Sequence, residues 1–106
     1  KMASGLKGTS APGAGSDTTV YTVSGSACVV NISACNTHAS TADTIEIYVV
    51  PTGTTKATSH AIEKDVSLAA AAVVERTGIV MGVGDFIVVN SANGTTSFNV
   101  WGMDLS

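Results

Sequence analysis

The sequence predicts an all-β protein: an antiparallel β-sandwich of jelly-roll-like form with seven or eight strands. Apolar and polar side chains alternate with a period of two in most apolar segments, which is the pattern of half-buried strands. The clearest alternation lies in residues 44–50, where three branched apolar side chains face away from Glu46 and Tyr48. Turn residues recur at intervals of about 8–12 residues, the spacing of a sandwich or a jelly roll.

Two predicted strands precede this segment. Residues 18–23 are rich in β-branched side chains, which favour extended backbone. In residues 28–35, apolar side chains occupy every even position and form one face of a strand. The central strand, residues 44–50, ends at Pro51, because proline cannot donate a hydrogen bond to the ladder.

The middle of the chain is less regular. Residues 59–65 predict a short strand with one large apolar anchor. Residues 66–76 would accept a helical turn at four consecutive alanines, but the two valines that follow favour a loop leading into a strand. Residues 77–81 continue that extended segment.

The end of the chain predicts two more strands. Residues 86–89 are apolar throughout, so both sides of this strand should be covered. The Asn93-Gly94 pair is the strongest short hairpin signal in the sequence. It predicts a hairpin that returns into a last strand at residues 96–103.

The chain has 106 residues, which is the size of one domain. Residues 1–17 are rich in Gly, Ser and Ala and cannot form a core of their own. We interpret them as a flexible N-terminal arm, and residues 18–106 as the β-sandwich domain. The arm could stay a mobile tail, or become ordered on a neighbouring subunit through Met2 and Leu6. Deleting residues 2–15 is expected to leave the domain folded.

Charge and composition exclude several classes of partner. Charged residues make up only 12% of the chain, and the net charge is -3. The basic residues are scattered, which argues against nucleic-acid binding and against a polybasic membrane contact. No apolar run approaches the roughly 18 residues of a membrane-spanning helix. A surface of small polar residues instead suits close packing against other protein subunits.

Cys28 and Cys35 fall on one predicted strand and face opposite ways. Extended backbone separates them by about 23 Å, whereas a disulfide needs Cα atoms within about 7 Å. We therefore expect two free thiols, which favours synthesis in a reducing cytosol.

The chemistry-bearing residues form no recognisable catalytic, cofactor-binding or metal-binding pattern. His38 and His60 lack a second His or Cys at ligand spacing, and acidic residues are spread singly along the chain. We therefore expect a protein that is not an enzyme and uses no cofactor or metal. Two rival classes stay open. One is a small hydrolase, if two carboxylates converge in a pocket, and the other is a carbohydrate-binding sandwich, if Trp101 lines a groove.

Apolar side chains on both faces of the late strands predict a homo-oligomer. A sandwich buries one face of each sheet in its own core, so a second apolar face needs a partner. A symmetric copy is the commonest such partner. The candidate interface residues are Met2, Leu6, Phe86, Val88, Trp101 and Met103.

Five short segments, spread over most of the chain, carry a family resemblance: residues 3–12 (ASGLKGTSAP), 29–36 (VVNISACN), 65–68 (DVSL), 75–81 (ERTGIVM) and 100–102 (VWG). In these segments the chain resembles small virion structural proteins of tailed bacteriophages, cyanophages included. The resemblance implies a β-sandwich subunit of the tail, baseplate or fibre region, or a capsid decoration (cement) protein. It also implies a virion location after synthesis in the host cytoplasm, with copies of itself and other virion proteins as partners. The alternative is a carbohydrate-binding host-recognition module with a glycan as ligand.

Overall fold

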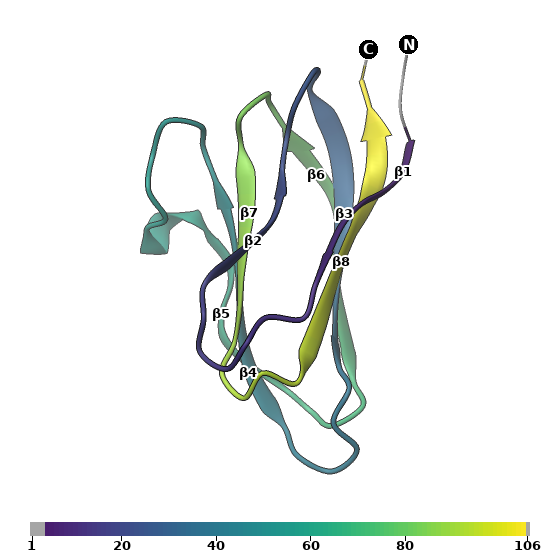
Figure 1. Cartoon of the computed structure of the whole chain (residues 1–106), viewed down its shortest axis with the longest axis vertical. Coiled ribbons are helices and arrows are strands. Elements are labelled where there is room, and N and C mark those ends of the chain that lie inside the picture. The colour runs from purple at the N-terminus through teal and green to yellow at the C-terminus, as the bar shows by residue number, and fades with distance from the viewer. Residues whose placement is uncertain (1–3, 106) are drawn as a thin grey trace.

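The computed structural model describes residues 4–105, which fold into two packed four-stranded antiparallel sheets (Figure 1). One sheet has the strand order β1-β8-β3-β6 and the other has the order β2-β7-β4-β5. The strands are β1 (Ser4–Ser10), β2 (Thr18–Thr22), β3 (Cys28–Asn36), β4 (Asp43–Val50), β5 (Ala61–Leu68), β6 (Val73–Met81), β7 (Phe86–Ser91) and β8 (Thr96–Asp104). A 3-10 turn, η1 (Thr58–His60), precedes β5.

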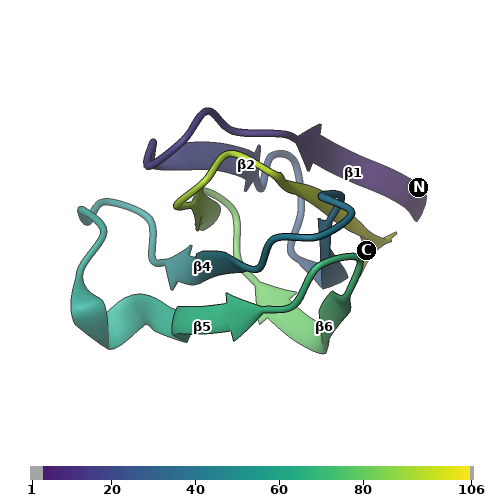
Figure 2. The same ribbon diagram turned by 90° about the horizontal axis from the view of Figure 1, so that it is seen from below.

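The two halves of the chain run antiparallel to each other, strand against strand. β1 pairs with β8, β2 with β7, β3 with β6 and β4 with β5, so the chain forms one long folded ribbon. The ribbon is then rolled up, so that β8 also pairs with β3 and β7 also pairs with β4. This order of eight strands in two sheets is a jelly roll, which confirms the predicted fold class. Figure 2 shows β1 beside β2 along one side of the sandwich, and β5 and β6 along the other.

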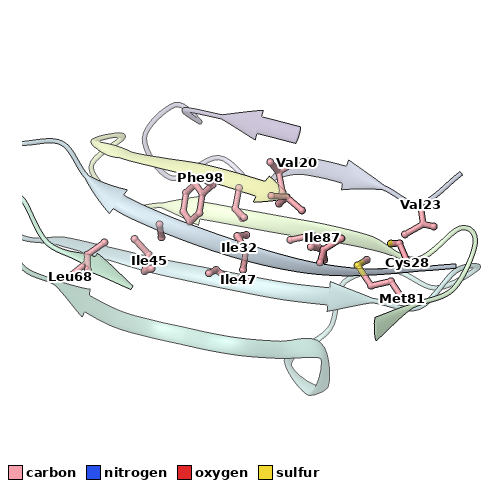
Figure 3. Close-up of a cluster of buried hydrophobic side chains, with 14 residues drawn as sticks. Val20, Val23, Cys28, Ile32, Ile45, Ile47, Leu68, Met81, Ile87 and Phe98 are labelled. Atoms are coloured by element: carbon pink, nitrogen blue, oxygen red, sulfur yellow. The ribbon is translucent and has the colours of Figure 1, made fainter. Parts of the chain in front are cut away.

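Alternate side chains of the strands fill the space between the sheets (Figure 3). On β3, the even-numbered side chains are buried and the odd-numbered ones are half-buried, as the period-two pattern predicts. The core consists of Val20, Val23, Cys28, Val30, Ile32, Ala34, Ile45, Ile47, Leu68, Met81, Ile87, Val89, Phe98 and Val100. Truncating a fully buried side chain such as Phe98 to alanine should cost about 3–5 kcal/mol.

Residues 4–10 form strand β1, and this differs from the expected flexible arm. β1 pairs with β8 along its whole length, and Lys7 Nζ lies 2.8 Å from the Asp104 carboxylate. One of its glycines is needed for close packing: a Cβ on Gly8 would lie 2.2 Å from the Val20 carbonyl oxygen. Gly8 therefore serves close packing between β1 and β2 rather than chain mobility.

The Asn93-Gly94 turn is tight but does not close a hairpin. Gly94 has a φ of 73°, and its N–H donates to the Ser91 carbonyl over 3.2 Å. The strands that the turn joins, β7 and β8, lie in different sheets. The hairpin expectation is wrong because turn residues determine only the local reversal, whereas packing against the core decides which sheet the next strand enters.

Two further expectations are confirmed. Residues 69–72 form a loop rather than a helix, and that loop leads into β6. The thiols of Cys28 and Cys35 are free, with Cys28 buried in the core and Cys35 half-buried on the opposite face of β3.

The four edge strands of the described sandwich each carry a β-bulge. β1 has an extra residue relative to β8 at Lys7, and β2 has one relative to β7 at Val20. β6 bulges against β3 near Gly78, and β5 bulges against β4 near Asp65, which has a φ of 52°. A bulge interrupts the row of free N–H and C=O groups along an edge, so these edges are poor templates for another strand.

Candidate functional site

The outer face of the β1-β8-β3-β6 sheet is nearly free of charge. Its side chains alternate with the buried ones, and the strand register places them side by side. We call this surface the neutral face; it consists of Ser4, Leu6, Thr9, Val29, Asn31, Ser33, Cys35, Val73, Glu75, Val80, Ser97, Asn99, Trp101 and Met103. Within this set, Glu75 alone carries a formal charge.

One end of the neutral face is apolar and exposed. Val80 is 71% exposed, Leu6 67% and Met103 42%. Trp101 and Val29 are half-buried beside them. Leu6 is paired with Trp101, and Val29 lies between Met103 and Val80, so the patch crosses all four strands. Contiguous exposed apolar patches of this kind mark contact surfaces.

Three of the six interface candidates from the sequence lie in this patch. Leu6, Trp101 and Met103 come from β1 and β8, which are far apart in the chain but adjacent in the sheet. Val80 belongs with them, although the sequence pattern did not single it out. Met2 lies outside the described residues.

Phe86 and Val88 belong instead to a smaller apolar cluster on the outer side of the β2-β7-β4-β5 sheet. Val88 is only 5% exposed because it packs with Tyr48 and Val50. The Lys56 ammonium, from the loop between β4 and η1, lies 4.5 Å from the centre of the Tyr48 ring. Both sides of β7 are therefore covered within the same chain, and a partner copy is not needed there.

Three of the five ion pairs among the described residues lie on this second sheet; the other two are Lys7–Asp104, between β1 and β8, and Arg76–Glu63, between β6 and β5. Lys56 Nζ lies 2.6 Å from the Asp17 carboxylate, and Lys64 Nζ lies 3.0 Å from Glu46 and 2.8 Å from Asp65. The hydrogen bond from Lys56 lowers the pKa of Asp17, and the bond from Lys64 lowers the pKa of Asp65. The two outer faces of the sandwich are thus opposite in character, one ionic and one neutral.

A shallow depression of about 450 Å³ lies where the end of β1 meets the start of β8. Its lining residues are Thr9, Ser10, Ala11, Ser97, Phe98 and Asn99. The polar groups in this lining are hydroxyls and one amide, which can exchange hydrogen bonds with an uncharged polar ligand. Trp101 is the next outward side chain along β8 after Asn99, but it is not part of the lining.

Asp43 is a buried carboxylate, 2% exposed, at the opposite end of the sandwich from the apolar patch. It accepts hydrogen bonds from the Ser91 hydroxyl, from Thr96 Oγ1 at 2.6 Å, and from the backbone N–H groups of Thr44 at 2.8 Å and Asn93 at 2.9 Å. Burial alone would raise its pKa, but these four donors together lower the pKa below its ordinary value. The carboxylate therefore fastens the start of β4 to the turn between β7 and β8.

The Asn36 side chain connects the neighbouring loops through hydrogen bonds. Its fully buried amide donates to the carbonyls of Thr41 and Leu68 at 2.9 and 3.1 Å, and accepts from Thr95 Oγ1 at 2.9 Å. These contacts join the β3–β4 loop, the end of β5 and the β7–β8 turn. Asp43 and Asn36 thus have positioning roles in the fold, and sequence reasoning missed both.

At the end of the core beside β1 and β2, Tyr21 Oη lies 3.9 Å from the Cys28 sulfur. Burial is the main reason that the pKa of Tyr21 rises to about 12, and the bond to Cys28 adds to it. The Tyr21 hydroxyl therefore stays protonated over the physiological range.

The two histidines act locally in their loops. His38 Nδ1 accepts the N–H groups of Ser40 and Thr41 at 3.1 and 3.0 Å, and His60 Nδ1 accepts that of Ala57 at 3.1 Å. Within residues 4–105, no group of three or more His, Cys, Asp or Glu side chains could hold a metal ion. In the same range, no helix has the length and apolarity to cross a membrane.

Comparisons with known proteins return no match: no family model, no curated protein and no solved structure is similar to this chain.

Proposed function

We propose that this chain is a non-enzymatic structural subunit of a bacteriophage virion. It would belong to the tail, baseplate or fibre region, or decorate the capsid as a cement protein. The observation that carries the proposal is the jelly-roll order of the eight strands, an architecture that recurs in viral capsid domains. The segments at residues 29–36 and 75–81 lead to the same expectation from the sequence alone.

The surface fits a subunit that works through contacts. Only 12% of the residues are charged, and the neutral face presents small polar side chains around an exposed apolar patch. The bulged edge strands favour contact through sheet faces over uncontrolled edge pairing. A particle component needs both properties, because it must bind specific neighbours without aggregating.

The test is to purify particles of the phage that encodes the chain on a density gradient and to analyse them by mass spectrometry. The chain should co-sediment with the particles at a constant ratio to the major capsid protein across the gradient. An electron-microscopy map should then contain the eight-strand sandwich at a defined position. A chain that is abundant in the lysate but missing from the particle fraction would refute the proposal.

A carbohydrate-binding host-recognition module is the second candidate, favoured by the polar depression on β1 and β8. Thr9 and Asn99 can hydrogen-bond sugar hydroxyls, and jelly rolls also serve as lectin domains. Binding on a glycan array that is lost in Asn99→Ala and kept in Ser33→Ala would support it. Ser33 is a suitable control because it lies on the same face but outside the depression.

A further inference from the structure

The arrangement of edges and charges limits how two copies of this chain can meet. The four edge strands are bulged, so contact is directed to the sheet faces. The outer face of the β2-β7-β4-β5 sheet is occupied by ion pairs and by the loop that carries Lys56. The neutral face has one charged side chain, Glu75, and its apolar end is uncovered.

We propose that the neutral face binds the neutral face of a second copy, so that two sandwiches stack back to back around Trp101. This inference rests on the proposed structural function, because it names the partner of that surface. With a net charge of -3, two copies repel each other over most of their surface. The neutral face is the surface that can be brought against its own copy without placing like charges together or burying an ion pair.

The face matches itself under two-fold symmetry. An axis along the seam between β8 and β3 places β6 of one copy over β1 of the other. Met103 then lies over Val29 of the second copy, and Leu6 lies near its Val80. The two Glu75 carboxylates fall on opposite sides of the contact, because each lies on an outer strand. Such self-complementarity is what a symmetric dimer interface requires.

The size of the face fits a reversible dimer. β3, β6 and β8 each have nine residues. At about 3.3 Å per residue and about 4.8 Å per strand, the face measures roughly 30 by 19 Å. Two such faces would bury about 1,100 Å² in total, which is at the lower end for specific interfaces. Interfaces of this size are typical of weak, transient contacts, so we expect a reversible dimer that forms where many copies are concentrated.

The test is sedimentation velocity of the full chain and three variants from about 1 to 300 µM, the range over which a weak dimer changes from mostly dissociated to mostly associated. The wild type should shift from monomer to dimer. V80K and M103K should weaken the dimer at least about tenfold, because each buries an ammonium group against the second copy. V83K is the matched control, since Val83 is also exposed, at 54%, but lies in the β6–β7 turn outside the neutral face. It should dimerise like the wild type.

Fluorescence of Trp101, the single tryptophan, gives a local readout. Its emission should move to shorter wavelength with rising concentration in the wild type and in V83K, and in V80K the same change should begin only at a clearly higher concentration. Circular dichroism melting checks that each variant is folded. A chain that is monomeric at all concentrations, or a dimer that V80K and M103K leave intact, would overturn the inference.

Failure of the dimer proposal can be distinguished from failure of the virion proposal. If the chain dimerises as described but is missing from purified particles, the dimer stands and the virion assignment falls. If the chain is found in particles, and V80K enters them in normal amounts while the isolated wild type stays monomeric, the dimer falls and the virion assignment stands. Glycan binding by a strictly monomeric chain removes the dimer and supports the second candidate function.

Discussion

Replacing Asp43 tests how strongly a buried carboxylate holds the loop end of the sandwich together. Its two oxygens accept four hydrogen bonds, two from hydroxyls and two from backbone N–H groups. Asp43→Ala leaves all four donors without this acceptor. Asp43→Asn keeps the shape and one oxygen, but replaces the other with an NH₂ group that cannot accept.

The expected magnitudes follow from those contacts. Each buried donor left unsatisfied costs about 1–3 kcal/mol, although hydroxyls can rotate and the backbone groups can gain water. We therefore expect Asp43→Ala to lower the free energy of unfolding by about 3–5 kcal/mol, and Asp43→Asn by about 1–2 kcal/mol. For a domain of this size 1 kcal/mol corresponds to roughly 4 °C in Tm, so the alanine variant should melt about 12–20 °C lower.

The pH dependence gives a second, independent signature. The pKa of Asp43 in the folded chain lies below its ordinary value of 3.8. The carboxyl group therefore loses its proton more readily in the folded chain than in the unfolded chain, and its ionisation stabilises the fold. Its contribution is complete above the unfolded pKa and is lost as the pH falls through the folded pKa. The stability difference between wild type and Asp43→Asn should be constant from about pH 5 to 7 and should shrink below about pH 4.

Urea unfolding followed by Trp101 fluorescence measures these differences, with Asp65→Asn as the control. Asp65 is an exposed carboxylate in a surface ion pair, so its replacement should leave the stability almost unchanged. If Asp43→Ala is as stable as Asp65→Asn, the hydrogen-bond network is not what holds these loops. If Asp43→Asn keeps the full acid dependence of the wild type, another group is responsible for it.

Two further predictions concern the sheet that contains β1. Gly102→Ala should destabilise the fold by more than about 3 kcal/mol, because its Cβ would lie 2.1 Å from the Val29 carbonyl oxygen, whereas Gly82→Ala should be tolerated, because its nearest contact is 3.6 Å. Equal melting temperatures for the two variants would contradict this. Deleting residues 2–15 should abolish cooperative unfolding or lower stability by several kcal/mol, because it removes β1 and exposes the edge of β8. A truncated chain with unchanged urea unfolding would show that β1 adds nothing to the fold.

The strands with strong alternation could be predicted from the sequence because each side chain's surroundings repeat every two residues. In β3 and β4, two buried polar residues that the sequence analysis missed follow the same alternation. Asn36 continues the buried even positions of β3, and Asp43 continues the buried odd positions of β4. A polar residue in register with a buried face is a signal for a satisfied internal hydrogen-bond network. That signal was available in the sequence.

Other features depend on contacts between distant segments, which local patterns do not contain. The Asn93-Gly94 pair fixes a reversal, but the sheet that β8 enters depends on its pairing with β1 and β3. The glycines of β1 resemble those of a mobile tail until the close approach of Gly8 to Val20 is known. The cover over Val88 likewise depends on how the β4–β5 loop folds back over that sheet.

Because residues 4–10 form strand β1 rather than a flexible arm, this segment serves assembly in a different way. A flexible arm would contribute by reaching across to a neighbour, at an ordering cost of about 1–2 kcal/mol per residue. As β1, the segment is already ordered, and it places Leu6 beside Trp101 in the apolar end of the neutral face. Without β1, β8 would be a sheet edge, and Trp101 would border unpaired backbone groups. The N-terminal segment therefore completes a preformed four-stranded surface, and its ordering cost is met in folding rather than at the moment of contact.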